Sequence, residues 1–139
     1  MIKLIENFYD ANNSSAYVKL ETDEGHFEGY AFLHPEDAEY ASEFLGFEIA
    51  ELKATKDYYA KKLNRLRIEI KTLENLLKDY IHHARIDEAD LLKKRLNQKI
   101  TQKAIYLEDY EGIKYELKVL SESHNEFIDK LRKKTQENK

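Results

Sequence analysis

A regular heptad repeat runs from Leu45 to Tyr80 and constrains the fold more than any other feature of the sequence. Positions seven residues apart hold apolar or tyrosine side chains, namely Leu45, Leu52, Tyr59, Leu66, Leu73 and Tyr80. The interleaved set is Ile49, Lys56, Leu63, Ile70 and Leu77, in which only Lys56 departs from the pattern. A spacing of about 3.5 residues keeps one stripe of a helix against a partner helix along its length. The repeat therefore predicts a long coiled-coil helix over residues 47–83.

A second long helix is predicted over residues 88–134. Asp87 and Asp90 resemble a helix N-terminal cap followed three residues later by an acid, so residues 84–86 should hold the chain reversal. The predicted apolar stripe of this helix is Leu92, Leu96, Ile100, Leu107, Tyr110, Ile113, Leu117, Leu120, Phe127 and Leu131, with His124 in phase. A short connection makes the two helices antiparallel neighbours and places residue n opposite about 171 − n.

The register of the second helix is less regular than that of the first. The spacing of Leu92 and Leu96 puts Lys99 and Lys103 on the stripe. The apolar residues in the same stretch, Ile100, Ala104 and Leu107, instead shift the stripe. We therefore expect a local change of supercoil there.

Before the helices, residues 1–34 read as a small β-meander. Residues 2–8, 16–20 and 26–33 are rich in β-branched and aromatic side chains, and turn-forming residues separate them. In the third strand one face carries Phe27, Gly29, Ala31 and Leu33, and the other carries Tyr30 and Phe32. Three strands need a hydrophobic cover, so the sheet should rest on the helices within one domain. The fold class is α+β and mainly α.

The junction between sheet and helices is predicted to contain a short helix over residues 35–45, because Pro35 suits a first helical position. Gly46 then either breaks the helix or lies where another backbone approaches closely, and we favour a break. The aromatic residues Tyr40, Phe44 and Phe47 should form the seat of the sheet. Under the predicted register, Phe127 and Leu131 return to this cluster.

Charge is strongly segregated along the chain, although the net charge is only −4. Residues 1–52 carry 12 acidic and 2 basic side chains, whereas residues 53–103 carry 14 basic and 7 acidic ones. Such segregation bears on partners rather than on fold. The chain has no cysteine, no apolar run of about 20 residues and no signal-peptide pattern at its start, so we expect a soluble, cytoplasmic protein without membrane contact.

Two surfaces are candidates for binding. The acidic head combines carboxylates with aromatic and histidine side chains, and its predicted partner-binding residues are Glu21, Asp23, Glu24, Glu28, Tyr30, His34, Glu36, Asp37, Glu39 and Tyr40. Aromatic anchors among charges suit a protein interface, and carboxylates on a rigid scaffold can occupy a basic cleft. The alternative is a basic helical stripe for nucleic acid or nucleotides, formed by Lys61, Lys62, Arg65, Lys93, Lys94 and Arg95. For either surface, the simpler interpretation is that its charged side chains only face solvent and bind no partner.

Catalytic chemistry is not expected. The sequence holds no phosphate-binding glycine loop, nucleophile elbow or zinc-protease helix. His82 and His83 are adjacent on a helix and point about 100° apart, which suits no shared metal. We therefore predict no catalytic residue, metal or cofactor.

A second copy of the chain is expected as a partner. Apolar side chains such as Ile68, Leu91 and Ile105 lie off the predicted seam. A lone hairpin would leave them in water, which favours a homodimer in a four-helix bundle. A purely structural coiled-coil subunit is a further alternative.

Two segments carry a resemblance to a known group of proteins. Residues 29–37 read Gly-Tyr-Ala-Phe-Leu-His-Pro-Glu-Asp, and residues 46–54 read Gly-Phe-Glu-Ile-Ala-Glu-Leu-Lys-Ala. Together they resemble a segment of small accessory proteins from bacteriophages and prophages of Gram-positive bacteria. The resemblance spans residues 29–54, about a fifth of the chain, and carries no catalytic residues. It implies a non-enzymatic inhibitor that binds a host protein, such as a CRISPR nuclease or another defence component.

Overall fold

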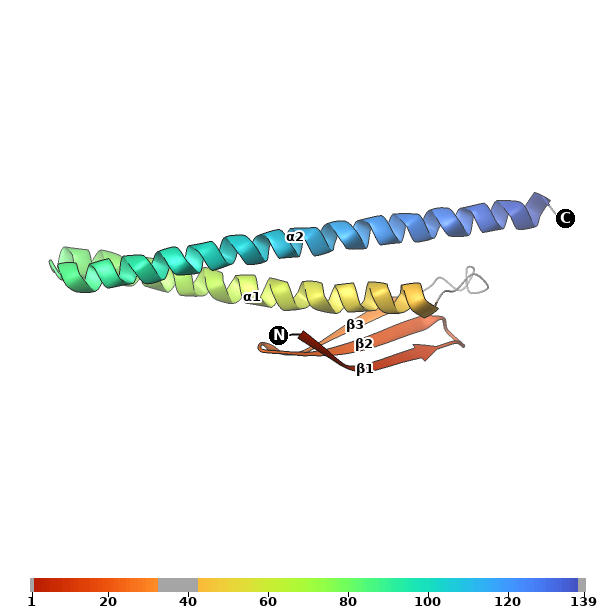
Figure 1. The fold of residues 1–139 in the computed structure, drawn as a ribbon, viewed down its shortest axis with the longest axis horizontal. Helices are drawn as coiled ribbons and strands as arrows, with labels where there is room; N and C mark the ends of the chain where they lie inside the picture. Colours follow the sequence, from red (N-terminus) through yellow and green to blue (C-terminus); the bar gives the residue numbers. More distant parts are fainter. Residues whose placement is uncertain (1, 33–42, 138–139) are drawn as a thin grey trace. The chain divides into compact units, whose positions relative to one another are not determined.

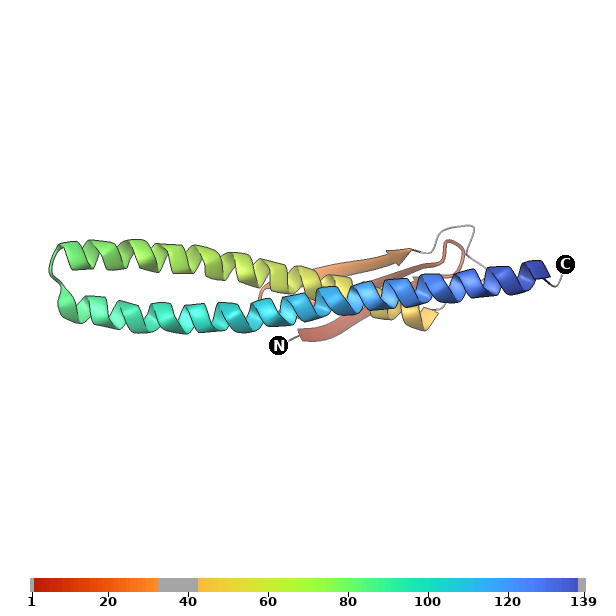
Figure 2. The same ribbon diagram turned by 90° about the horizontal axis from the view of Figure 1, so that it is seen from above.

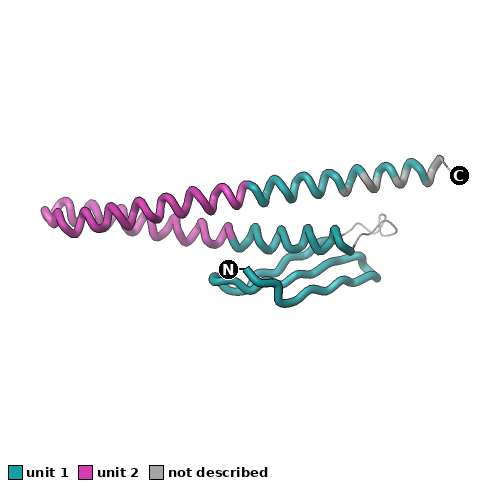
Figure 3. Tube along the Cα trace, in the orientation of Figure 1, with its two compact units in different colours: residues 1–58, 112–139 teal, residues 59–111 magenta. Residues whose placement is uncertain are grey.

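A computed structural model describes residues 2–32 and 43–137, without the side chains of several residues after position 123. The elements are β1 (Ile2–Asp10), β2 (Ser15–Thr22), β3 (Gly25–Phe32), α1 (Glu43–His82) and α2 (Ile86–Glu137) (Figure 1). The mainly helical α+β class is therefore confirmed. The chain divides into two compact units, one of residues 1–58 with 112–139 and one of residues 59–111 (Figure 3).

The three strands form an antiparallel meander in the order β1-β2-β3, as predicted. The register of β1 shifts between Leu4 and Glu6, which is a β-bulge on an edge strand. The β2–β3 turn contains two residues and is closed by Gly25 at φ 108°, a conformation that glycine adopts without strain. At the β1–β2 turn, the backbone N–H of Asn12 donates a hydrogen bond to the Asp10 carboxylate at 2.9 Å. Local side-chain chemistry thus fixes both hairpins.

One face of the sheet packs on the first part of α1 (Figures 1 and 2). Gly46, Ala50 and Ala54 lie four residues apart and so share one stripe of the helix. The small side chains let the strands approach the helix backbone. A methyl group on Gly29 of β3 would overlap the Ala50 carbonyl oxygen. The core of this unit consists of Ala16, Val18, Leu20, Ala31, Ala50 and Ala54.

Two predictions about this junction are wrong. Gly46 does not break the helix, since α1 begins at Glu43 and runs through it. A methyl group there would lie 3.1 Å from the Ala16 Cβ, so the glycine accommodates a strand side chain. Phe44 does not seat the sheet, because 71% of its surface is exposed. Phe47 does pack on the core, with its ring 6.2 Å from that of Tyr9.

Other predictions for this region fall on residues that are not described. The short helix over 35–45 lies largely outside the described residues, as do Leu33 and Tyr40. The predicted return of Phe127 and Leu131 to the aromatic cluster concerns side chains that are likewise outside them.

In the unit of residues 59–111, α1 and α2 form the predicted antiparallel hairpin (Figure 2). Residues 83–85 make the reversal, and Ala84 adopts a positive φ of 57°. The Arg85 amide donates to the Tyr80 carbonyl at 2.9 Å, a bond that closes a Schellman-type helix end. The helix α2 begins at Ile86, two residues earlier than predicted. Asp87 and Glu88 then lie in its first turn, where carboxylates favour the helix dipole.

The helix register within this hairpin differs from the prediction by three residues. The Lys99 ammonium lies 3.0 Å from the Glu69 carboxylate, and the Lys62 ammonium lies 4.6 Å from the centre of the Tyr106 ring. Residue n therefore lies opposite about 168 − n, because the reversal is centred on Ala84. On α1 the predicted seam residues Leu63, Leu66 and Ile70 are buried.

The predicted stripe of α2 is wrong at Ile100 and Leu107, which are exposed. The less exposed positions continue the heptad through Leu92, Leu96, Lys99, Lys103, Tyr106 and Tyr110. The seam therefore does not shift to Ile100 and Leu107 in this stretch. The reason for expecting a local change of supercoil is thus removed. Lysine is accommodated on the seam because its aliphatic stem can be covered while its ammonium group reaches Glu69.

Neither of the two described helices contains a stretch long and apolar enough to cross a membrane.

Candidate partner-binding surface

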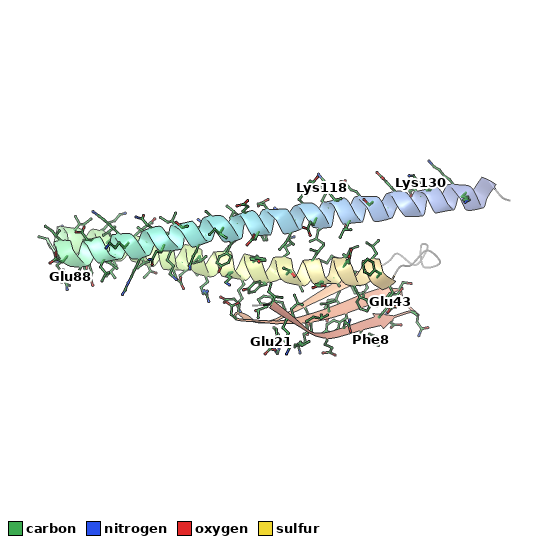
Figure 4. The ribbon with its side chains drawn as sticks, in the orientation of Figure 1. Phe8, Glu21, Glu43, Glu88, Lys118 and Lys130 are labelled. Carbon is green, nitrogen blue, oxygen red and sulfur yellow. The ribbon has the colours of Figure 1, made fainter. Side chains whose placement is uncertain are left out.

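The face of the sheet turned away from α1 carries a row of aromatic side chains. Strand register pairs Phe8 with Tyr17 and Tyr17 with Tyr30, so the three residues lie side by side across β1, β2 and β3. Side chains alternate between the faces of a strand, and the neighbouring residues Val18 and Ala31 are buried on the α1 side. Figure 4 shows Phe8 and Glu21 on the side of the sheet away from α1.

The aromatic row continues along β3 to Phe32. The ring centres of Tyr17 and Tyr30 are 5.1 Å apart, and the rings of Tyr30 and Phe32 are stacked at 6.1 Å with 9° between their planes. Phe8 is 61% exposed, Tyr30 45% and Phe32 71%. We call these four residues, Phe8, Tyr17, Tyr30 and Phe32, the aromatic patch. The rings of Tyr17, Tyr30 and Phe32 contact one another in sequence, Phe8 lies beside Tyr17 by strand register, and the patch leaves apolar surface exposed to solvent.

Glu28 holds the two tyrosines in place. Its carboxylate oxygens accept hydrogen bonds from the Tyr17 hydroxyl at 2.9 Å and from the Tyr30 hydroxyl at 3.3 Å. Desolvation by the packed rings raises the pKa of Tyr17 to about 12, and the hydrogen bond to Glu28 and its charge add to the effect. Desolvation and the charge of Glu28 also raise the pKa of Tyr30. Both phenols therefore stay protonated donors throughout the neutral range.

Charged side chains flank the aromatic patch. The next cross-strand row is Glu6, Lys19 and Glu28, in which the single lysine lies between two carboxylates. The row beyond it is Lys3, Glu21 and His26. Across residues 2–32 there are six carboxylates and two lysines, a net charge of −4. The two rows themselves hold three carboxylates and two lysines, so the outer face combines exposed aromatic rings with a small excess of negative charge.

The predicted acidic residues divide into three groups. Glu21, Glu28 and Tyr30 lie together on this outer face. Asp23 and Glu24 form the β2–β3 turn, where Asp23 accepts a hydrogen bond from the Tyr58 hydroxyl of α1 and so helps to hold the sheet on the helix. The remaining predicted residues, His34, Glu36, Asp37, Glu39 and Tyr40, lie outside the described residues.

The sequence places Tyr17 and Tyr30 among the carboxylates of the acidic head, but Phe8 and Phe32 were missed as members of this surface. A signal was present, since each is an aromatic residue in a predicted strand or directly beside one. The bulge between Leu4 and Glu6 changes which β1 side chains share a face, and it cannot be located from composition. Strand register, rather than residue type, brings the patch together.

The predicted basic stripe is less uniform than expected. Lys62 is only 8% exposed, and its ammonium group lies over the Tyr106 ring. The Nε atom of the Arg65 guanidinium lies 3.7 Å from a carboxylate oxygen of Glu69. Lys61, Lys93, Lys94 and Arg95 are exposed. Positions 93–95 lie opposite 73–75 under the observed register and opposite 76–78 under the predicted one, so neither register brings them beside the lysines at 61 and 62.

Among the described residues, no group of three or more His, Asp or Glu side chains is arranged to hold a metal ion. Comparison of the chain with protein-family models, curated proteins and solved structures gives no match. The resemblance to phage accessory proteins therefore stays a prediction that rests on its two short segments.

Proposed function

We propose that this protein is a non-enzymatic binding module that docks a partner protein onto the outer face of its sheet. The partner presents a basic surface, such as the nucleic-acid groove of a host nuclease, and the module acts by covering it. The phage-like segments support a bacterial host as the source of the partner. The charge segregation of the chain supports a partner of positive potential.

The exposed aromatic patch carries this proposal. Exposure of a cluster of large aromatic side chains to water is unfavourable. Such side chains contribute most of the binding energy of protein interfaces. Here Glu28 fixes the orientation of Tyr17 and Tyr30, so little side-chain entropy remains to be lost on binding. The surrounding carboxylates then favour a basic partner and accelerate its approach.

Nucleic-acid binding through the helices has less support. The Lys62 ammonium group lies over the Tyr106 ring between the two helices rather than on the exposed surface. Arg65 lies beside the Glu69 carboxylate. The exposed group Lys93, Lys94 and Arg95 is short, and few phosphate contacts give weak binding that salt removes.

Capture from a bacterial lysate tests the proposal with matched pairs of aromatic substitutions. Phe8→Ala and Tyr30→Ala remove rings from the patch, whereas Phe44→Ala and Tyr115→Ala remove rings elsewhere that are at least as exposed. We expect the patch variants to retain about a tenth or less of the captured partner, the loss typical of a binding hot spot. The two control variants should capture as much as the unmodified chain.

Circular dichroism and thermal melting verify that all four variants are folded. Equal loss of capture in the patch and control variants, or no loss in either, would contradict the assignment of the partner surface to this face.

A further inference from the structure

The two edges of the sheet differ in how well they are protected. In the order β1-β2-β3, both β1 and β3 are edge strands among the described residues. The β1 strand carries a bulge between Leu4 and Glu6, and bulges disrupt edge-to-edge pairing. The β3 strand pairs with β2 over eight consecutive residues without a register shift, and it contains neither proline nor lysine. No strand within residues 2–32 and 43–137 pairs with the outer edge of β3, so this edge presents a regular row of backbone donors and acceptors.

The side chains along β3 define what such an edge would accept. Glu28, Tyr30 and Phe32 point to the outer face, where the stacked rings of Tyr30 and Phe32 form a flat platform along the strand. Gly29 and Ala31 are buried on the opposite face, beside α1. Cross-strand neighbours in a sheet interact directly, and opposite charges and aromatic pairs stabilise it.

We propose that the outer edge of β3 receives an extended segment of the partner protein as an antiparallel fourth strand. The segment places an arginine or lysine opposite Glu28 and an aromatic side chain opposite Tyr30, with small apolar residues between them. This mode of recognition takes its affinity from main-chain hydrogen bonds and its specificity from alternate side chains. The inference rests on the proposed function and specifies the partner segment that the outer face recognises.

A basic segment fits this edge better than a second copy of β3. The strands and turns of each copy carry a net charge of −4, so two copies paired edge to edge would repel. A basic segment instead makes an attractive interaction with Glu28, the carboxylate at this edge. Lys19, the basic residue of the same row, lies one strand further in on β2.

Fluorescence anisotropy with a synthetic peptide and the full chain tests this proposal. The probe is fluorescein-labelled Lys-Thr-Val-Tyr-Val-Arg-Val-Thr-Lys, with a scrambled peptide of the same composition as control. Two further peptides carry N-methyl groups on alternate residues. One is methylated on its three valines, and the other on its two threonines, its tyrosine and its arginine. In a strand only one of these sets turns its amides toward β3. We expect one methylated peptide to lose binding and the other to retain it.

A charge swap locates the register. Glu28→Lys should weaken binding of the probe by about tenfold, and replacing the arginine of the peptide by glutamate should restore it. Glu43→Lys, a charge reversal at the start of α1, serves as the control and should leave binding unchanged. Rescue by the swapped peptide separates direct pairing from a structural effect on Tyr17 and Tyr30.

The outcomes separate the two proposals. Equal binding of both methylated peptides, with loss in Phe8→Ala and Tyr30→Ala, would keep the face and overturn the fourth strand. Absence of binding at millimolar probe would overturn the proposal of a fourth strand at β3. The lysate capture would then still test whether the outer face binds the partner. A dimer in sedimentation whose β3 amides are protected from hydrogen exchange, and lose that protection on dilution to the monomer, would assign the edge to a second copy and contradict the basic segment.

Discussion

Gly29 of β3 lies directly against the carbonyl group of Ala50 in α1. A methyl group built on Gly29 would overlap the Ala50 oxygen, lie 2.8 Å from its carbonyl carbon and lie 3.0 Å from the Ala54 nitrogen. These are backbone atoms of a helix, which cannot move aside as a flexible side chain can. This contact sets how closely the sheet approaches α1, and the position of the outer face depends on it.

The first prediction compares two Gly→Ala substitutions. Gly29→Ala should lower the free energy of unfolding by at least about 3 kcal/mol, because overpacking against backbone forces the sheet away from α1. Gly112→Ala, in α2 with no atom within 4 Å of the added methyl, should raise it by about 0.5–1 kcal/mol through helix propensity. Urea denaturation followed by circular dichroism measures both. Similar effects of the two changes would contradict the close contact.

The second prediction concerns alkaline pH. Because the pKa of Tyr17 is raised from 10.0 to about 12 in the folded chain, the folded state holds this proton more tightly than the unfolded state. The resulting stability is fully present below pH 10 and is lost as pH rises through about 12. Ultraviolet titration of the tyrosines should show a late phase in the folded chain. Glu28→Gln should move part of that phase toward lower pH, and an unchanged profile would exclude the Glu28 contacts.

The third prediction tests the helix register. A zero-length carbodiimide cross-link should join Lys99 to Glu69, whose charged atoms are 3.0 Å apart, and peptide mass spectrometry identifies the product. Glu69→Gln removes the link and serves as its control. Mixing isotopically light and heavy chains distinguishes a hairpin closed within one chain from one exchanged between two. Any link that joins a light peptide to a heavy one would show exchange, because a hairpin closed within one chain gives only light–light and heavy–heavy links.

The fourth prediction separates neighbouring lysines. Lys62→Ala should cost about 1–2 kcal/mol of stability, because a buried stem and a cation–π contact with Tyr106 are lost. Lys61→Ala, on the exposed side of the same turn, should change stability by less than about 0.5 kcal/mol. Thermal unfolding of the two variants decides between a seam position and a solvated basic stripe for Lys62.

The main elements of the fold follow from pattern alone. The heptad from Leu45 to Tyr80 predicts α1, and turn-forming residues at 10–15 and 23–25 predict the meander. The sheet-facing stripe of α1 was missed because Gly46, Ala50 and Ala54 contribute little to a hydrophobic pattern. Their role is steric, and it becomes visible only when the sheet lies against them.

The errors on α2 have a related cause. Apolar character predicts Ile100 and Leu107 on the seam, yet Lys99, Lys103 and Tyr106 continue the heptad there. A lysine fits the seam when a partner such as Glu69 is present on the facing helix, and that pairing depends on the register of the reversal. The apolar side chains left outside the seam, including Ile68, Leu91, Ile100 and Ile105, do not fall at one heptad position. The homodimer therefore stays a prediction, which a mass measurement in solution would test.

Hydrogen–deuterium exchange of the full chain, alone and with the protein that it captures from lysate, tests the central claim most directly. If the outer face and edge of the sheet bind the partner, the largest gain in protection falls on β3 and the adjoining residues of β2, with the hairpin of residues 59–111 unchanged. Protection confined to that hairpin, with the exchange of β3 unaltered, would contradict the account.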